Sequence, residues 1–423
     1  MQDNFIIDLI DKAGYMAEIR RNLFESIKNN FQKKEFDIIT GARQTGKSFL
    51  LKQFYNELTA TGNQVYLVTL ENPEILEAIN QHPERIFDYI PKPGEQRIYL
   101  LVDEIQYASN PSNFLKLLFD LYADKLKIIA TGSSAFYIDK NFNDSLAGRK
   151  RLHELFTLDF EEFVIFKGAD QSITGEIRLI RENPQYISLK RSEINTLFDE
   201  YLVFGGYPAV TLSNPVDEKR EILRELLNTY IKRDIYESEI QYETKFYNLL
   251  TLLSHQTGNL LNVNELSRTL QLSVSAIENY LYILQKCYHI SLLRPFYKNI
   301  RKELTKMPKV YFNDLGFRNI LQNYFETPQN RIDKGQVIEN YLFIRLRQLY
   351  GEDALNFWRT VDGKEVDFLV TTQFNKGFAI ESKFNETEFL VSKYGKFRAA
   401  YPDYPLRVVS YVSLKPENNV LKI

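Results

Sequence analysis

Four residues in the stretch GARQTGKS have the types and the spacing that bind phosphate. Gly41 and Gly46 are separated by four residues, and Lys47 and Ser48 follow directly. The glycines let backbone N–H groups close around phosphate oxygens, the lysine neutralises the outer phosphates, and the hydroxyl reaches Mg²⁺. The predicted nucleotide contacts are Gly41, Ala42, Arg43, Gln44, Thr45, Gly46, Lys47, Ser48 and Phe49.

Two acidic residues follow an apolar run in the stretch RIYLLVDE. The run ends at Val102, and Asp103 and Glu104 come next. The carboxyl ends of strands meet the ligand crevice in an open α/β sheet. Asp103 is therefore placed to hold Mg²⁺ through water, and Glu104 to polarise an attacking water. The predicted chemistry is Mg²⁺-dependent hydrolysis of a nucleoside triphosphate.

A third stretch, KLKIIATGSS, ends in small polar residues. Thr131 and Ser133 are able to hydrogen-bond a γ-phosphate or the attacking water. The same letters also make a good turn, so both interpretations stay open. We count Ser133 among the predicted nucleotide contacts.

The elements that must position these residues can be predicted from hydrophobic patterning. The β-branched run FDIIT precedes the glycine-rich loop, and apolar residues at Phe49, Leu50, Phe54 and Leu58 follow it at helical spacing. Strand, loop and helix in this order are the context that a phosphate-binding loop requires. The pattern predicts a P-loop parallel sheet within residues 1–167.

Over about residues 15–165 these stretches resemble the AAA-type ATPases. The segment SLAGR continues the resemblance with an S-x-x-G-R pattern, which implies a phosphate-sensing or finger role for Arg149. A solvated basic loop with Lys150 and Arg151 is the alternative. No N-K-x-D motif for reading guanine is present, which leaves ATP as the expected nucleotide.

The middle of the chain is predicted to be helical and to carry a basic stretch. Residues 168–192 are polar and weakly patterned, so a boundary is expected there. Residues 190–325 then have helical patterning, with a winged helix-turn-helix at about 246–312. Between Lys286 and Lys309 seven basic residues stand against one acidic residue, Glu303. Four of them are predicted to contact DNA without sequence specificity: Lys298, Arg301, Lys302 and Lys306. A module that packs only on protein is the alternative.

Near the C-terminus, four charged residues have the spacing of a metal-dependent site. Glu339 falls on a predicted helix, Asp367 on a strand, and Glu381 and Lys383 on the next strand. Carboxylates bind divalent ions that activate water, and a lysine can position or deprotonate the nucleophile. An ordinary ion pair between Glu381 and Lys383 on a sheet face is the alternative.

This order of helix and strands resembles the restriction-endonuclease-like, PD-(D/E)xK fold. Residues 326–423 carry the resemblance, although Val366 stands where that pattern has proline. It implies a small α/β nuclease-like domain. A working nuclease and a retained scaffold both fit the four residues.

Composition limits the class of protein. A length of 423 residues suggests two or three domains, and 44% hydrophobic with 26% charged residues is typical of a soluble globular protein. A net charge of −2 gives no global attraction to nucleic acid, and one cysteine, Cys287, excludes an internal disulfide. No apolar run approaches the roughly 18 residues that span a membrane, so we expect a cytoplasmic protein with no membrane partner.

The sequence therefore predicts a multi-domain α/β protein that binds and hydrolyses ATP with Mg²⁺. It is expected to engage nucleic acid through the winged helix and to carry a nuclease-like domain, whose activity is left open. The alternative is a signalling or scaffold ATPase that binds a protein partner and has an inactive tail. A homo-oligomer is expected if Arg149 acts in trans, but the sequence decides neither that nor the subunit number.

Overall fold

The computed structural model describes residues 19–132, 148–238, 240–296 and 306–423. The chain divides into two compact units, Met1–Leu155 and Phe156–Ile423, called here the N-terminal and the C-terminal unit. Within the described residues, every helix is either too short or too polar to cross a membrane.

The N-terminal unit is built on a five-stranded sheet in the order β2-β3-β4-β1-β5. All neighbouring strands are parallel. The strands are β1 (Phe36–Thr40), β2 (Gln64–Thr69), β3 (Ile98–Asp103), β4 (Leu126–Gly132) and β5 (Lys150–Glu154). Because β4 lies between β1 and β3, the loops that leave β1 and β3 flank its end. The predicted P-loop type of parallel sheet is confirmed.

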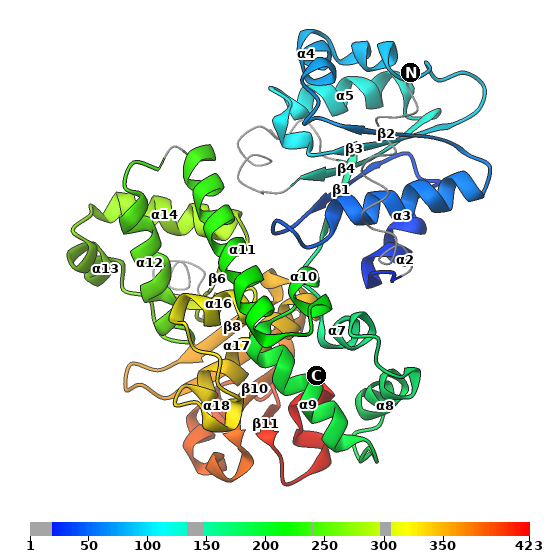
Figure 1. Ribbon diagram of the computed structural model, residues 1–423. Helices are drawn as coiled ribbons and strands as arrows, with labels where there is room; N and C mark the ends of the chain where they lie inside the picture. Colours follow the sequence, from blue (N-terminus) through cyan, green and yellow to red (C-terminus); the bar gives the residue numbers. More distant parts are fainter. Residues whose placement is uncertain (1–18, 133–147, 239, 297–305) are drawn as a thin grey trace. The chain divides into compact units, whose positions relative to one another are not determined.

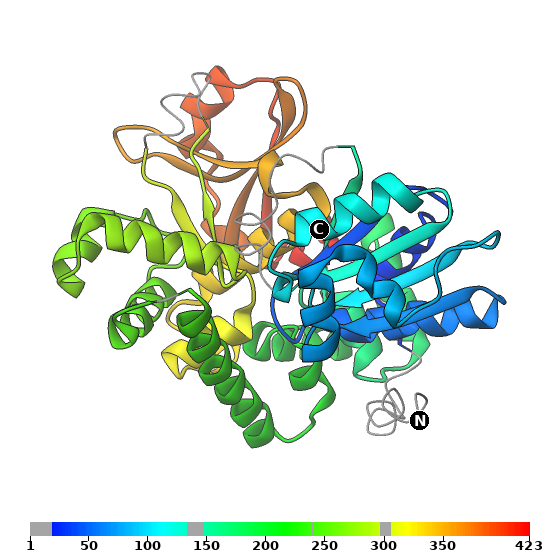
Figure 2. The same cartoon turned by 90° about the horizontal axis from the view of Figure 1, so that it is seen from above.

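Helices cover both faces of this sheet (Figures 1 and 2). One face carries α2 (Asn22–Lys28) and α3 (Lys47–Ala60), and the other carries α4 (Pro73–Gln81) and α5 (Pro111–Tyr122). Successive side chains of β1 point to opposite faces of the sheet. Ile38 packs with α4 and α5, and Ile39 packs with α2 and α3. Burial on both faces explains why β1 reads as a continuous apolar run.

The C-terminal unit begins with a helical region. Helices were predicted from residue 190, but they already begin at Phe160, and one of them, Gln171–Glu182, lies in the stretch 168–192 where a boundary was expected. Its helices are α7 (Phe160–Phe166), α8 (Gln171–Glu182), α9 (Arg191–Phe204), α10 (Pro208–Leu212), α11 (Val216–Glu237), α12 (Glu243–His255), α13 (Val263–Leu270) and α14 (Val274–Lys286). An antiparallel pair follows, β6 (Ile290–Leu293) with β7 (Lys309–Phe312), and then α16 (Leu315–Gln322). Three helices before a strand pair suit the predicted winged helix, which stays a prediction.

A small mixed sheet completes the chain. After α17 (Lys334–Tyr350), its strands lie in the order β11-β10-β9-β8. The strands are β8 (Leu355–Arg359), β9 (Glu365–Gln373), β10 (Lys376–Asn385) and β11 (Leu406–Val412), with α18 (Gly395–Ala400) before the last. Strands β8, β9 and β10 are antiparallel, whereas β10 and β11 are parallel. This confirms the predicted order of strands after one helix; the likeness to a nuclease stays a prediction.

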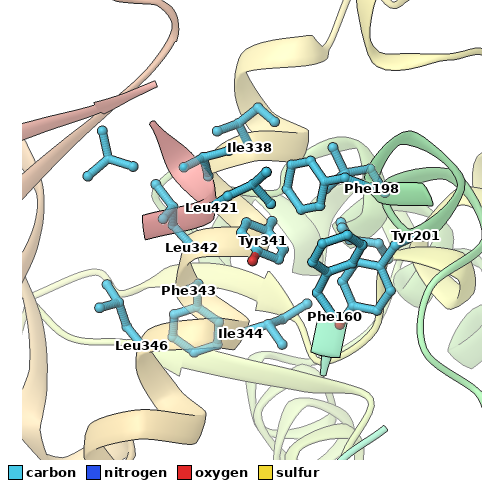
Figure 3. Close-up of a cluster of buried hydrophobic side chains, with 14 of the residues drawn as sticks. Phe160, Phe198, Tyr201, Ile338, Tyr341, Leu342, Phe343, Ile344, Leu346 and Leu421 are labelled. Carbon is cyan, nitrogen blue, oxygen red and sulfur yellow. The ribbon is translucent and has the colours of Figure 1, made fainter. Parts of the chain in front are cut away.

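One hydrophobic core joins the first helices of the C-terminal unit to α17 and the mixed sheet. The ring of Tyr341 lies 4.9 Å from that of Phe198 and 6.1 Å from that of Tyr201. Figure 3 shows these rings grouped with Phe160 on one side of α17. The same core runs on to Leu421 near the C-terminus. The predicted division of this part at residues 190 and 325 stays a prediction.

Candidate functional site

The glycine-rich loop connects β1 to α3 and needs its glycines for two different reasons. Gly41 has φ +143°, and a Cβ placed there would lie 2.2 Å from the carbonyl oxygen of Leu155. Gly46 precedes the first residue of α3 with φ +98°. Thr45 is buried and its hydroxyl donates to the Ala42 carbonyl at 2.9 Å. The loop therefore delivers its backbone N–H groups to the start of a helix, where phosphate binds.

Lys47 is the first residue of α3, and its ammonium group is buried inside the loop. Nζ donates to the carbonyl oxygens of Gly41 at 2.9 Å and Ala42 at 2.7 Å. Burial lowers the pKa of Lys47 to about 8, although the charge of Glu104 opposes that shift. Phosphate oxygens are stronger partners for an ammonium group than carbonyl oxygens are. Lys47 can therefore exchange its carbonyl partners for phosphate oxygens.

Asp103, at the end of β3, lies between two hydroxyl groups. The Thr131 hydroxyl, from β4, donates to its Oδ1, and the Ser48 hydroxyl lies within hydrogen-bonding reach. Burial raises the pKa of Asp103, while both hydroxyls work against that rise. Ser48 and Asp103 bring together the oxygen donors that a hard cation prefers. Their chemistry suits Mg²⁺, and the assignment of these two residues to the ion stays a prediction.

Glu104 follows Asp103 in a backbone conformation that is unusual for a residue with a side chain. Its φ is +56° and its ψ is +52°. Its N–H donates to the Thr131 hydroxyl oxygen at 3.1 Å, and the Gln106 side-chain amide donates to its carboxylate. Strained backbone of this kind gathers at functional sites, where neighbouring contacts hold it. The Thr131 hydroxyl contacts both Asp103 and Glu104, and its predicted role toward phosphate or water stays a prediction.

Two contacts of this site were not predicted from the sequence. The buried Arg21 donates from Nη1 to the Thr45 carbonyl oxygen at 2.7 Å, although it lies 24 residues before the loop contact. Gln106 restrains Glu104 from two residues further along. Arg21 lies outside any motif, so a single sequence gives no signal for its contact. Gln106 lies two residues after Glu104, and this spacing could have suggested a contact between their side chains.

Two further residues, Ser133 and Arg149, were predicted to act on the nucleotide. Ser133 lies outside the described residues. Arg149 immediately precedes β5, where its backbone carbonyl accepts from the N–H of Phe36, and its side chain pairs with Asp120 at 2.9 Å. Phe36 is the first residue of β1, and the glycine-rich loop follows the last residue of that strand. Arg149 therefore lies about 13 Å, the length of β1, from the glycine-rich loop of the same chain. A finger role in trans stays a prediction.

In the C-terminal unit, Glu339, Asp367, Glu381 and Lys383 gather at one charged cluster. Asp367 Oδ2 accepts from the N–H of Ser382 at 2.8 Å, and Lys383 Nζ donates to Glu381 Oε1 at 2.5 Å. Burial, and then the charge of Asp367, raise the pKa of Glu381 to about 8. Burial also raises the pKa of Glu339 to about 7, against the charge of a nearby lysine.

That lysine is Lys309, the first residue of β7. It is the last of the seven basic residues in the basic stretch, but its side chain is buried and does not face solvent as a phosphate contact would. Only 2% of its side chain is exposed, and its Nζ lies within ion-pairing distance of Glu339, Glu365 and Asp367. Burial works against its charge, but the three carboxylates together raise the pKa of Lys309. A lysine at the end of a basic stretch gave no hint that it turns inward.

Among the residues that the structure describes, no three Asp, Glu, His or Cys side chains form a group arranged to hold a metal ion. The assignment of Glu339, Asp367, Glu381 and Lys383 to a metal-dependent nuclease site stays a prediction. Of the basic stretch, Arg294 and Lys306 are exposed. Lys298, Arg301 and Lys302 lie outside the described residues.

Three family models match the chain. Residues 33–164 match an AAA domain. This part of the chain is an AAA-type ATPase domain. Residues 195–327 and 334–422 match two domains of unknown function, DUF8612 and DUF4143. The predicted AAA-type ATPase domain is therefore confirmed, and the two later matches assign no activity.

Curated relatives and solved structures are similar over much of the chain. An uncharacterized protein of Methanocaldococcus jannaschii is 25% identical over 393 residues, which are 91% of this chain and 82% of that protein. An uncharacterized protein of Haemophilus influenzae is 25% identical over 346 residues, 78% of each chain. The Aeropyrum pernix ORC1 protein in complex with DNA is 10% identical with a TM-score of 0.33, covering 73% of this chain and 94% of that chain. AMPPCP-bound DnaA from Aquifex aeolicus is 15% identical with a TM-score of 0.29, covering 63% and 88%.

Proposed function

We propose that the N-terminal unit binds ATP with Mg²⁺ and hydrolyses it, and that the protein works as an ATP-driven switch or motor. The observation that carries the proposal is the Thr131 hydroxyl, which joins Asp103 and Glu104 beside a phosphate-binding loop. Lys47 binds the outer phosphates and Glu104 orients the attacking water. Ser48 and Asp103 would hold Mg²⁺, which would supply positive charge to the phosphates.

Two substitutions test this proposal by separating binding from hydrolysis. Lys47→Ala removes the phosphate contact, so ATP binding and ATP turnover should both be lost. Glu104→Gln keeps the size of the side chain but not its charge, so ATP should stay bound while turnover falls by at least about 100-fold, as expected for loss of a general base. Lys125→Ala removes an exposed lysine of the same unit and should change neither. Turnover at the parent rate in the Lys47→Ala protein would reject the assignment.

We propose further that the C-terminal unit binds nucleic acid without sequence specificity. The support is the exposed pair Arg294 and Lys306, which flank the basic run in the sequence. Phosphate contacts of this kind weaken steeply as salt rises. A protein partner is the alternative, and nuclease activity stays a prediction.

Charge reversal distinguishes these partners. The double substitution Arg294→Glu with Lys306→Glu should weaken binding to double-stranded DNA at low salt by about tenfold or more, and should flatten its salt dependence. Lys376→Glu, an exposed lysine at the start of β10, is the matched control. Absence of DNA binding by the parent protein at low salt would favour a protein partner.

A further inference from the structure

The ammonium group of Lys309 lies among three carboxylates, two of which, Glu339 and Asp367, are predicted to bind a metal. Its Nζ is 3.0 Å from Glu339 Oε1, 2.5 Å from Glu365 Oε1 and 3.8 Å from Asp367 Oδ1. Glu339 comes from α17 and the other two from β9, whereas Lys309 comes from β7. One cation from a separate strand pair thus contacts carboxylates of two elements.

The Lys309 ammonium group is buried and held by its neighbours. The Lys309 side chain is 2% exposed, and Nζ lies 5.5 Å from the centre of the Phe357 ring. The Tyr311 hydroxyl, also from β7, donates to Glu339 Oε1 at 2.6 Å. A lysine has three N–H donors, and three carboxylates lie within ion-pairing range of it. Buried carboxylates need a positive partner, and Lys309 supplies it here.

A divalent ion at the predicted site would need the carboxylate oxygens of Glu339 and Asp367 that face Lys309. Mg²⁺ binds carboxylate oxygens at about 2.0–2.1 Å and Ca²⁺ at about 2.3–2.6 Å, so neither can share the space with an ammonium group. The facing oxygens of Glu339 and Glu365 are already within contact distance of Nζ. In the other half of the predicted site, Lys383 already contacts one oxygen of Glu381, Oε1. In this arrangement the residues do not fit a metal.

We propose that Lys309 is the resident cation of this cluster and takes the place that a divalent ion occupies in a metal-dependent nuclease. The cluster then holds β7 against α17 and β9 by charge pairing. It follows that the folded protein binds no divalent ion through Asp367, and that removal of the ammonium group opens a cation site there. The proposal does not depend on the ATPase assignment.

The experiment measures Mn²⁺ binding to the full chain without nucleotide, by the loss of the free Mn²⁺ signal in electron paramagnetic resonance. The parent protein and Asp367→Asn should bind Mn²⁺ equally. Lys309→Met keeps the length of the side chain without its charge. It should bind one more Mn²⁺ ion than the parent, with an affinity at least tenfold higher than the parent has at that site. The double variant Lys309→Met with Asp367→Asn should lose that added ion.

Two results would overturn the proposal. One is Mn²⁺ binding by the parent protein that Asp367→Asn abolishes, and the other is a folded Lys309→Met protein that gains no ion. If Lys309→Met folds only with metal, its melting temperature should rise with Mn²⁺ while that of the parent and of Lys309→Arg stays constant. The comparison of the parent with Asp367→Asn needs no Lys309 variant, so it decides the question even if Lys309→Met does not fold.

Discussion

Lys47 is a buried ammonium group whose protonation should depend on phosphate. With carbonyl partners only, its pKa is lowered to about 8 by burial. Anionic phosphates favour the charged form and should raise that pKa again. At pH 8 the lysine is about half protonated, so ATP binding should take up about half a proton. Calorimetry in two buffers of different ionisation enthalpy measures this uptake, and it should fade at pH 6.5. Uptake that stays the same at pH 6.5 would assign it to another group.

Thr131 offers a second test at the scale of one residue, because it contacts Asp103 and Glu104 with the same hydroxyl. Thr131→Val keeps the shape but leaves the N–H of Glu104 without that acceptor. A lost buried hydrogen bond costs about 1–3 kcal/mol, so we expect ATP turnover to fall about tenfold or more with little change in ATP affinity. Thr131→Ser keeps the hydroxyl and should retain most of the activity. Steady-state kinetics and nucleotide titration measure the two effects.

At the scale of elements, local patterning was enough to predict most strands and helices. FDIIT, RIYLLVDE and EVDFLV have strong apolar runs, and β1, β3 and β9 lie where they predict. What patterning does not contain is the contact between distant elements. Lys309 turns inward only because α17 and β9 bring carboxylates to β7, and Arg21 reaches the glycine-rich loop only because α2 packs on α3. Such partners depend on tertiary packing, which a single sequence does not show.

The junction between α16 and α17 should be sensitive to acid. Arg318 is fully buried in α16 and pairs with Asp333 at 2.8 Å, as Arg331 does at 2.7 Å. Burial would raise the pKa of Asp333, but the two arginines outweigh it and lower the pKa to about 2. The folded state thus binds this proton less tightly than the unfolded chain, whose Asp pKa is about 3.9. The stabilisation is complete above about pH 4 and is lost as pH falls toward 2.

Asp333→Asn tests this junction directly. At pH 7 it should lower the free energy of unfolding by about 3 kcal/mol or more, because it leaves a buried arginine without its charge partner. The difference in the free energy of unfolding between Asp333→Asn and the parent should be smaller at pH 3 than at pH 4. Urea unfolding at both pH values measures it, and Asp403→Asn, an exposed aspartate of the same unit, is the control. A difference that is constant over this range would contradict the ion pair.

At the scale of the whole molecule, the chain has more than one core, as its length suggested. The two faces of the parallel sheet are filled within the N-terminal unit. Among the described residues, the core of the C-terminal unit runs from Leu158 to Leu421 and includes none before the boundary at 155. Helix α7 belongs to this second core through Phe160 and Phe163, although the sequence analysis placed residues up to 167 with the ATPase.

A fragment of residues 156–423 should therefore fold on its own, because its core is complete. We expect one cooperative thermal transition by circular dichroism, unaffected by ATP, whereas ATP with Mg²⁺ should stabilise the intact chain through its N-terminal unit. A fragment that begins at residue 168 lacks Phe160 and Phe163, and loss of a buried Phe side chain costs about 3–5 kcal/mol. It should melt at a clearly lower temperature or fail to fold. Equal melting of the two fragments would show that α7 contributes little to this core.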